Sequence, residues 1–224
     1  MQLKGKIINF LGDSITEGCG VIDQSNRYDN ILKRKYGIKS VNNYGIGGTR
    51  IARQSTDTKS TNEDLCFCHR VEGISRDADI VIVYGGVNDY LHGDAPFGDE
   101  TDNTPSTFCG AVNYLMMYLK NEFFGKNIVF MTPAHCFFWG VSDKEPSRYF
   151  TKISDSKPLI EYVKVIINAG KRHEIPVLNL FDELGIDANV SEMQKEFIPD
   201  GLHFNDKGHY VLAECLGEFL KSLE

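Results

Sequence analysis

The sequence predicts an α/β fold built on five parallel strands that are joined by crossover helices. Short, nearly continuous apolar runs alternate with segments of helical periodicity, which is the pattern of a parallel sheet covered on both faces. No repeat, low-complexity tract or change of composition marks a second module. We therefore expect the 224 residues to form one domain, residues 1–224, around a central five-stranded parallel sheet. The expected strands are 7–11, 40–43, 80–84, 128–131 and 177–180.

Apolar residues recur at helical spacing between these runs. One stripe lies in residues 28–36, a second in 108–123, and a third in a helix expected from about 159 to 172. At the carboxyl end, Asn205 or Asp206 can cap a further helix. Each of these helices has one apolar face to pack on the sheet.

Two connections, 91–105 and 133–158, are longer than a simple loop between a strand and a helix. Long loops in compact domains are frequently functional, so we expect these two to form substrate walls. The second contains Phe137, Phe138 and Trp139, whose rings could stack on a sugar or line an acyl pocket. The competing interpretation is that these aromatic residues cover the core beneath the loop.

Composition and charge argue against several classes of partner. A net charge of −7 and an isoelectric point near 5.4 argue against nucleic acid, because that affinity comes mostly from lysine and arginine. No apolar run approaches the length of a membrane span, and the apolar stretch 7–11 is too short for the core of a signal peptide. We expect a cytoplasmic protein without a membrane span. The sequence does not indicate the oligomeric state.

The six cysteines show no repeated pairing pattern, which favours reduced and mostly buried thiols. Cys66, Cys68 and His69 could contribute metal ligands. Structural zinc sites usually bring a second ligand pair at regular spacing, and none follows here. We therefore expect neither a metal nor an organic cofactor.

Glycine-rich turns with polar groups follow the first three expected strands. The first turn contains Asp13 and Ser14, the second Gly47 and Gly48, and the third begins at Gly85 and contains Asn88 and Asp89. In an open parallel sheet, ligands bind beyond the carboxyl ends of the strands, where the strand order reverses. We expect these turns to meet there and form a functional site.

Asp200 and His203 form a fourth segment, which precedes the last helix. Residues three apart in a helical turn lie within about 5–6 Å, so the Asp200 carboxylate could accept a hydrogen bond from one ring nitrogen. The other nitrogen would then be free to take the proton of a serine hydroxyl, which is a poor nucleophile without such a base. Ser14 is the candidate nucleophile. The competing role for Asp200 is that of a simple turn residue.

The oxyanion formed in acyl transfer needs preorganised hydrogen-bond donors. The backbone N–H of Ser14, a glycine after the second strand and the Asn88 amide could supply them. The alternatives are that Ser14 caps the segment after it and that Asn88 bonds its own backbone in a turn. The choice between the adjacent glycines Gly47 and Gly48 stays open.

Further residues were weighed for supporting roles. Asp13, Asp89 and Trp139 are candidates for substrate binding, although Asp13 also suits the role of holding its turn. The histidines without the context of His203 are expected to be structural or to lie on the surface. They are His69, His92, His135, His173 and His209.

These four segments, in their order along the chain, resemble the sequence blocks of the SGNH hydrolase superfamily, also called GDSL esterases. The first block has Ser-Ile where the family name has Ser-Leu, a change that removes no reacting group. The resemblance implies a flavodoxin-like three-layer α/β/α sandwich. It also implies Ser14 as nucleophile, Asp200 and His203 as its partners, and Gly48 and Asn88 as oxyanion donors. The Gly-x-Ser-x-Gly elbow of the α/β-hydrolases is absent.

We therefore expect a serine esterase that works through an acyl-enzyme intermediate. The expected substrate is a small acyl ester, acetyl above all, on a carbohydrate. This expectation rests on the activities common in the family and on the polar composition of 91–105. The alternatives are a lysophospholipase or thioesterase using the same site, and a glycan-binding module that does not catalyse a reaction.

Overall fold

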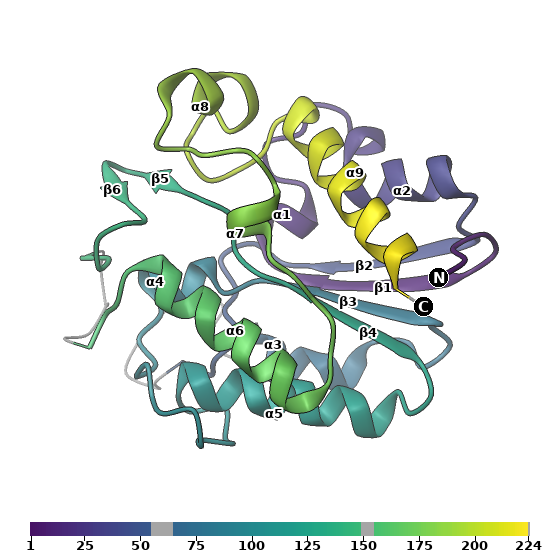
Figure 1. Cartoon of the computed structure of the whole chain (residues 1–224), viewed down its shortest axis with the longest axis horizontal. Coiled ribbons are helices and arrows are strands. Elements are labelled where there is room, and N and C mark those ends of the chain that lie inside the picture. Colours follow the sequence, from purple (N-terminus) through teal and green to yellow (C-terminus); the bar gives the residue numbers. More distant parts are fainter. Residues whose placement is uncertain (55–64, 149–154, 224) are drawn as a thin grey trace.

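The computed structural model describes residues 1–54, 65–148 and 155–223, and its centre is a parallel sheet between two layers of helices (Figure 1). The strand order is β2-β1-β3-β4-β7, and each strand is parallel to its neighbours. The expected three-layer α/β/α class is confirmed. The strands are β1 (Ile7–Gly12), β2 (Ser40–Gly45), β3 (Ile80–Tyr84), β4 (Asn127–Met131) and β7 (Val177–Leu178).

The strand order reverses between β1 and β3. The chain runs outward from β1 to β2 and then crosses back to β3 on the other side of β1. Gly12 at the end of β1 is paired with Gly45 of β2 and Tyr84 of β3. Because the three strands end at the same level, the turns that follow them meet at the switch point where ligands of such sheets bind.

Alternate strand residues face the two helical layers. Leu11 and Val83 belong to the core below the sheet, whereas Phe10 and Ile82 belong to the core above it. The upper layer in Figure 1 contains α2 and α9, and the lower layer contains α3, α5 and α6. These helices are α2 (Tyr28–Tyr36), α3 (Phe67–Arg70), α5 (Phe108–Glu122), α6 (Leu159–His173) and α9 (Asp206–Ser222).

Several short helices carry the connections at the carboxyl ends of the strands. Asn205 caps α9 through its side chain, as one of the two expected caps. The short elements are α1 (Ser14–Glu17), α4 (Val87–His92), α7 (Leu180–Glu183), α8 (Ser191–Phe197) and the 3₁₀ helices Gln24–Asn26 and Val71–Gly73.

A two-stranded hairpin lies within the long connection 133–158, and the sequence analysis did not predict it. Its antiparallel strands are β5 (Phe137–Phe138) and β6 (Val141–Ser142). Trp139 and Gly140 between them both have positive φ, of 49° and 77°, as a two-residue hairpin turn of the primed type requires. The other long connection, 91–105, packs Phe97 against Tyr162 of α6, with ring centroids 5.1 Å apart.

Two strand predictions differ from the structure in detail. The last strand was expected to reach residue 180, but β7 ends at Leu178 because Asn179 caps α7. The second strand was expected to be buried on both faces, but every residue of β2 is only half-buried, because β2 forms an edge of the sheet.

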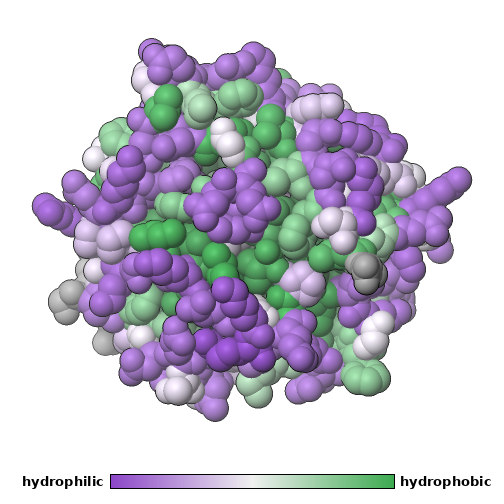
Figure 2. All heavy atoms as spheres, viewed as in Figure 1, coloured by the Kyte–Doolittle hydropathy of each residue, from purple (hydrophilic) through white to green (hydrophobic). Residues whose placement is uncertain are grey.

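Most of the surface seen in Figure 2 is hydrophilic. Hydrophobic residues gather near the middle of this view, which in Figure 1 is the region between α7 and α6. This is where the other edge of the sheet, β7, lies. Among the described residues, no helix combines the length and hydropathy needed to cross a membrane.

Candidate active site

Ser14, His203 and Asp200 form one hydrogen-bonded chain. Ser14 Oγ lies 2.9 Å from His203 Nε2, and His203 Nδ1 lies 2.6 Å from Asp200 Oδ2. Ser14 is the first residue of α1, directly beyond β1, while the other two residues come from the turn before α9. The fold therefore brings together residues that are 189 positions apart in the sequence.

The Asp200 carboxylate is held by its own turn. Its Oδ1 accepts hydrogen bonds from the backbone N–H of Leu202, at 2.9 Å, and of His203, at 2.7 Å. Partial burial raises the pKa of Asp200, but the hydrogen bonds from His203 and the turn outweigh it, so the net shift of the pKa is downward. Asp200 is therefore ionised at neutral pH and keeps the Nδ1 proton of His203 in place.

Two backbone N–H groups beside Ser14 donate to no acceptor in the described part of the chain. They belong to Ser14 itself and to Gly48, which has a left-handed φ of 72°. The N–H of the neighbouring Gly47 differs, because it donates to Glu17 Oε2 at 2.8 Å. The glycine pair thus offers one committed donor and one that a ligand can use.

Asn88 lies in the first turn of α4, and its side chain is buried, with the residue only 3% exposed. Its Nδ2 donates to the carbonyl oxygen of Thr49 at 3.0 Å, and its Oδ1 lies 3.0 Å from His92 Nε2. An amide nitrogen carries two protons, so the bond to Thr49 leaves a second donor. The Asn88 side chain therefore joins the turn after β3 to the turn after β2.

Asp13 and Asp89 are both buried, and each accepts hydrogen bonds from backbone. Asp13 caps α1 by accepting from the N–H of Ile15, and burial raises its pKa to about 7 against the opposing effect of that hydrogen bond. Asp89 accepts from the N–H groups of Ile51 and Ala52 at 2.8 and 2.9 Å. Both carboxylates therefore hold a strand-end turn, and the substrate contacts of Asp13 and Asp89 stay predictions.

Trp139 is the third candidate for substrate contact, and it lies on the surface at the turn of the hairpin. The hairpin is tied to the turn that carries Asp200 and His203 by a hydrogen bond of 2.9 Å from the Phe137 N–H to the Gly201 carbonyl. Phe138 presents its ring edge-on to His203, with centroids 6.2 Å apart, and stacks on Trp139 at 4.3 Å. Trp139 is 60% exposed. Phe138 therefore lies between the histidine and the exposed ring of Trp139 in a continuous series of ring contacts.

The hairpin approaches the turn so closely that a side chain at residue 201 would not fit. Gly201 has a left-handed φ of 84°, and a Cβ on it would lie 1.7 Å from the Phe137 carbonyl oxygen. Both the conformation and the contact require glycine at this position.

Arg70 supports the site, and the sequence analysis did not identify it. It donates to the carbonyl oxygens of Tyr44 at 2.6 Å and Gly12 at 2.9 Å, which are at the ends of β2 and β1. Burial lowers its pKa to about 10. It also donates to Thr49 Oγ1 at 2.9 Å. Because most of its partners are backbone carbonyls, no residue pattern in the sequence indicated this role.

His92 was expected to be structural or exposed, yet it contacts the predicted oxyanion donor Asn88. A signal for this contact was present in the sequence. Asn88 and His92 are four residues apart, a spacing that places two side chains on the same face of a helix.

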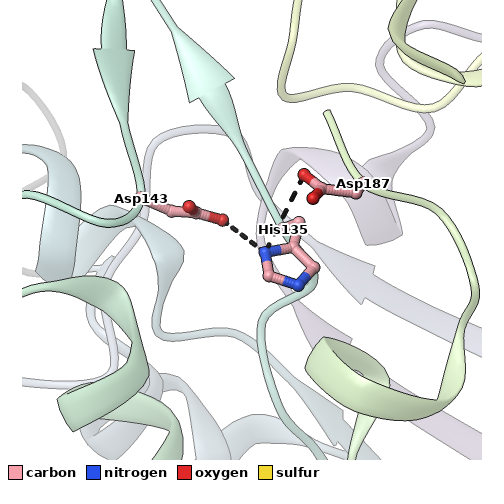
Figure 3. A group of neighbouring side chains, drawn as sticks. All are labelled: His135, Asp143 and Asp187. Carbon is pink, nitrogen blue, oxygen red and sulfur yellow. Dashed lines mark hydrogen bonds and ion pairs between the residues drawn. The ribbon is translucent and has the colours of Figure 1, made fainter. Parts of the chain in front are cut away.

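Metal-ligand types come together at His135, Asp143 and Asp187, which form the group that meets ligand spacing within the described ranges (Figure 3). His135 Nδ1 is 2.6 Å from Asp143 Oδ2 and 4.0 Å from Asp187 Oδ1. Asn189 Nδ2 donates to both carboxylates, at 3.0 and 2.9 Å. In this structure the three side chains are therefore linked by hydrogen bonds and ion-pair contacts. Cys66 and Cys68, the less favoured metal candidates of the sequence analysis, are buried, and Cys68 donates its thiol to the Ala111 carbonyl.

Comparison with known proteins gave one family and several similar structures. Residues 10–211 match the model of the GDSL-like lipase/acylhydrolase family. A crystal structure of a Lactobacillus plantarum protein is 28% identical over 99% of each chain, with a TM-score of 0.82. No curated protein matches the chain.

More distant structures share the fold. A GDSL-like protein from Bacteroides ovatus is 18% identical over 97% of this chain and 99% of its own, with a TM-score of 0.64. The acetyl xylan esterase AlAXEase is 17% identical over 95% and 98% of the two chains, with a TM-score of 0.62. The family match covers the strand-end segments described above, from the end of β1 to the turn before α9. The chain therefore belongs to the GDSL-like lipase/acylhydrolase family.

Proposed function

We propose that the protein is a serine esterase in which Ser14 attacks the acyl carbon of the substrate. The observation that carries this proposal is the hydrogen-bonded chain from Asp200 through His203 to Ser14. An alcohol becomes an effective nucleophile when a positioned base takes its proton, and an aspartate behind the base fixes the required tautomer. Membership of an acylhydrolase family supports the same assignment.

The reaction proceeds in two steps. His203 Nε2 takes the proton of Ser14 Oγ as this oxygen bonds to the acyl carbon, and the N–H groups of Ser14, Gly48 and Asn88 stabilise the resulting oxyanion. His203 then gives the proton to the alcohol oxygen as its bond to the acyl carbon breaks. Water attacks the acyl-Ser14 ester in the same way, which releases the acid and restores the serine.

Gly48 is favoured over Gly47 as the backbone donor from the second turn. The N–H of Gly47 already donates to the Glu17 carboxylate. The N–H of Gly48 has no acceptor among the described residues. A donor must be unoccupied, and already oriented, to stabilise charge as it develops.

The proposed substrate is a small acyl ester, acetyl in particular, of a carbohydrate. Trp139 supports a sugar as the alcohol part, since an exposed indole, linked to the base through Phe138, can stack on an apolar sugar face. AlAXEase, which shares the fold, is an acetyl xylan esterase. The chain length of the acyl group would separate this substrate from a lysophospholipid or a long-chain thioester.

Labelling with a fluorophosphonate probe tests the nucleophile. We expect a single modification at Ser14, and Ser14→Ala should lose both labelling and hydrolysis of para-nitrophenyl acetate. Labelling at another residue, or full activity in Ser14→Ala, would contradict the proposal. A panel of acetylated sugars and of aryl esters of increasing acyl length, run on the wild type, then tests the substrate. Faster turnover of long acyl chains would contradict the small-acyl assignment.

A further inference from the structure

We infer that His92 and Arg50 are positioning residues that fix which end of the Asn88 side chain faces the reacting carbonyl. This inference rests on the proposed function, in which Asn88 Nδ2 stabilises the oxyanion. Three contacts of equal length carry it. Arg50 Nη1 lies 3.0 Å from His92 Nδ1, His92 Nε2 lies 3.0 Å from Asn88 Oδ1, and Asn88 Nδ2 lies 3.0 Å from the Thr49 carbonyl oxygen.

The hydrogen-bonding capacity of Arg50 assigns the protons in this chain. A guanidinium group has donors and no acceptor, so His92 Nδ1 must be the acceptor of that bond. A neutral imidazole with an accepting Nδ1 carries its proton on Nε2. His92 Nε2 therefore donates, and the Asn88 atom that it meets must be the carbonyl oxygen.

The opposite end of the Asn88 amide gives the same assignment independently. The Thr49 carbonyl oxygen can only accept, so the atom facing it must be the amide nitrogen. The two ends agree, and a flipped amide would place two acceptors together at Thr49 and two donors together at His92. One proton of Asn88 Nδ2 thus bonds the Thr49 carbonyl oxygen. The second proton is consequently directed toward the reacting carbonyl of the substrate.

The chain of hydrogen bonds also polarises the donor. Arg50 is only 5% exposed, so its charge acts on His92 with little screening by water. Hydrogen bonds in series polarise one another, which strengthens the last donor of the chain. In this series of hydrogen bonds, the charged guanidinium of Arg50 thus lies at the end away from the developing oxyanion, and the Asn88 donor lies at the end toward it.

The three residues come from elements that the fold already holds rigidly. Asn88 and His92 lie on the same face of α4, and the carbonyl of Asn88 accepts from the Gly93 N–H at 2.9 Å. Arg50 lies in the segment after β2, where its carbonyl accepts from the Phe67 N–H at 2.8 Å. The chain therefore spans the turns after β2 and β3, which both contribute oxyanion donors.

Steady-state kinetics of His92→Phe and His92→Gln on para-nitrophenyl acetate test the inference. We expect His92→Phe to lower kcat about 10- to 100-fold with little change in KM, since the amide is misplaced only for the transition state. Glutamine can place an N–H near the position of His92 Nε2 and an oxygen toward Arg50. His92→Gln should therefore keep most of the activity.

The same substitution in an Asn88→Ala background distinguishes positioning from a general structural role. If His92 acts through Asn88, His92→Phe adds no further loss once Asn88 is absent. A damaged fold would lower kcat in both backgrounds by the same factor. His173→Phe is the matched control, because His173 Nε2 also lies beside an asparagine oxygen, Asn113 Oδ1 at 3.1 Å, in α5 and α6 instead of at the site.

Each outcome has a separate meaning. Equal losses from His92→Phe with and without Asn88, or no loss in either, would overturn the positioning role. A normal kcat in Asn88→Ala would overturn the oxyanion assignment on which it rests. If Asn88→Ala loses activity while Ser14 is still labelled, the proposed nucleophile stays intact. The claim about His92 and the claim about Ser14 can therefore fail independently of each other.

Discussion

His203 is held between two partners that differ in their exposure to water. Ser14 is buried, with only 7% of its surface exposed, whereas the Asp200 side chain is 47% exposed. Water can therefore reach the Asp200 side of the imidazole more easily than the Ser14 side. The two contacts of the same histidine should differ in their importance for catalysis.

Asp200→Ala should retain more activity than Ser14→Ala. Water can accept the hydrogen bond from His203 Nδ1 in place of the half-exposed carboxylate, while nothing replaces the nucleophile. We expect kcat/KM of Asp200→Ala to stay about 10- to 100-fold above that of Ser14→Ala on para-nitrophenyl acetate. Circular dichroism of both variants is the control for folding. Equal loss in two folded variants would show that the aspartate is indispensable.

At the scale of the structural elements, the β5–β6 hairpin connects the turn that carries Asp200 and His203 to the protein surface. Tyr90 of α4 fixes its far side by donating its hydroxyl to the carbonyls of Ser142 and Glu145, at 3.0 and 2.9 Å. Gly201 fixes its near side. The hairpin is thus a supported wall, and Trp139 at its turn adopts a left-handed conformation that costs a non-glycine residue about 1–3 kcal/mol.

Trp139→Ala should weaken binding of a sugar ester without harming the chemistry. Removal of the exposed ring takes away a stacking surface for the alcohol part, and Ser14 and His203 keep their contacts. We expect KM for an acetylated xylose oligomer to rise about 2- to 12-fold, since aromatic stacking contributes about 0.5–1.5 kcal/mol. The kinetics on para-nitrophenyl acetate should change less. The reverse pattern, with KM for the sugar ester unchanged, would place sugar binding elsewhere.

The hairpin is also linked to the connection between β7 and α8 through His135, Asp143 and Asp187 (Figure 3). Burial lowers the pKa of His135, but its hydrogen bond to Asp143 and the two carboxylate charges outweigh burial and raise it above 6.5. The charged pair therefore stabilises the fold below pH 6.5, and this contribution is lost as the pH rises through the raised pKa.

His135→Asn should remove that pH dependence. Asparagine can still donate a hydrogen bond toward Asp143, but it cannot become charged. We expect the wild type to exceed the variant in free energy of unfolding most clearly below pH 6.5, with the difference shrinking at higher pH. Urea denaturation across this range measures the difference. A constant gap between the two proteins would mean that the ion pair adds nothing to stability.

At the scale of the whole molecule, the sequence was enough to predict those features that depend on residues close together in the chain. Buried strands such as β3 appear as continuous apolar runs, and the spacing of Asp200 and His203 lies within a single turn. The sheet then follows from general rules of strand connection, which place the strand-end turns together. The hydrogen bond between Ser14 and His203, by contrast, depends on geometry that only the structure supplies.

Features that depend on burial or on backbone partners could not be predicted in this way. The hairpin was missed because its strands contain only two residues each, too few for a periodic pattern. The role of Arg70 was not predicted because most of its partners are carbonyl oxygens, which every residue carries. The burial of Asp13 and Asp89 is likewise not visible in the residues beside them.

At the scale of the whole molecule, the buried ionisable residues His209 and Asp13 affect how the free energy of unfolding depends on pH. His209 of α9 is fully buried, and its Nδ1 accepts from the Tyr28 N–H at 3.3 Å. Burial lowers its pKa from 6.5 to about 4. Asp13 acts in the opposite direction, because burial raises its pKa from 3.8 to about 7. Because the two effects oppose each other, the free energy of unfolding of the wild type alone, measured against pH, does not separate them.

A His209→Asn variant isolates the histidine, since asparagine can still accept from the Tyr28 N–H but does not titrate. Above pH 6.5 the wild type keeps the full contribution of neutral, packed His209. As the pH falls from 6.5 toward about 4, the unfolded chain binds a proton that the folded one resists, and the wild type loses about 3 kcal/mol relative to the variant. Replacement of the exposed His69 by asparagine is the surface control. Unfolding curves of wild type and His209→Asn that keep the same separation at every pH would show that His209 titrates as it does in the unfolded chain.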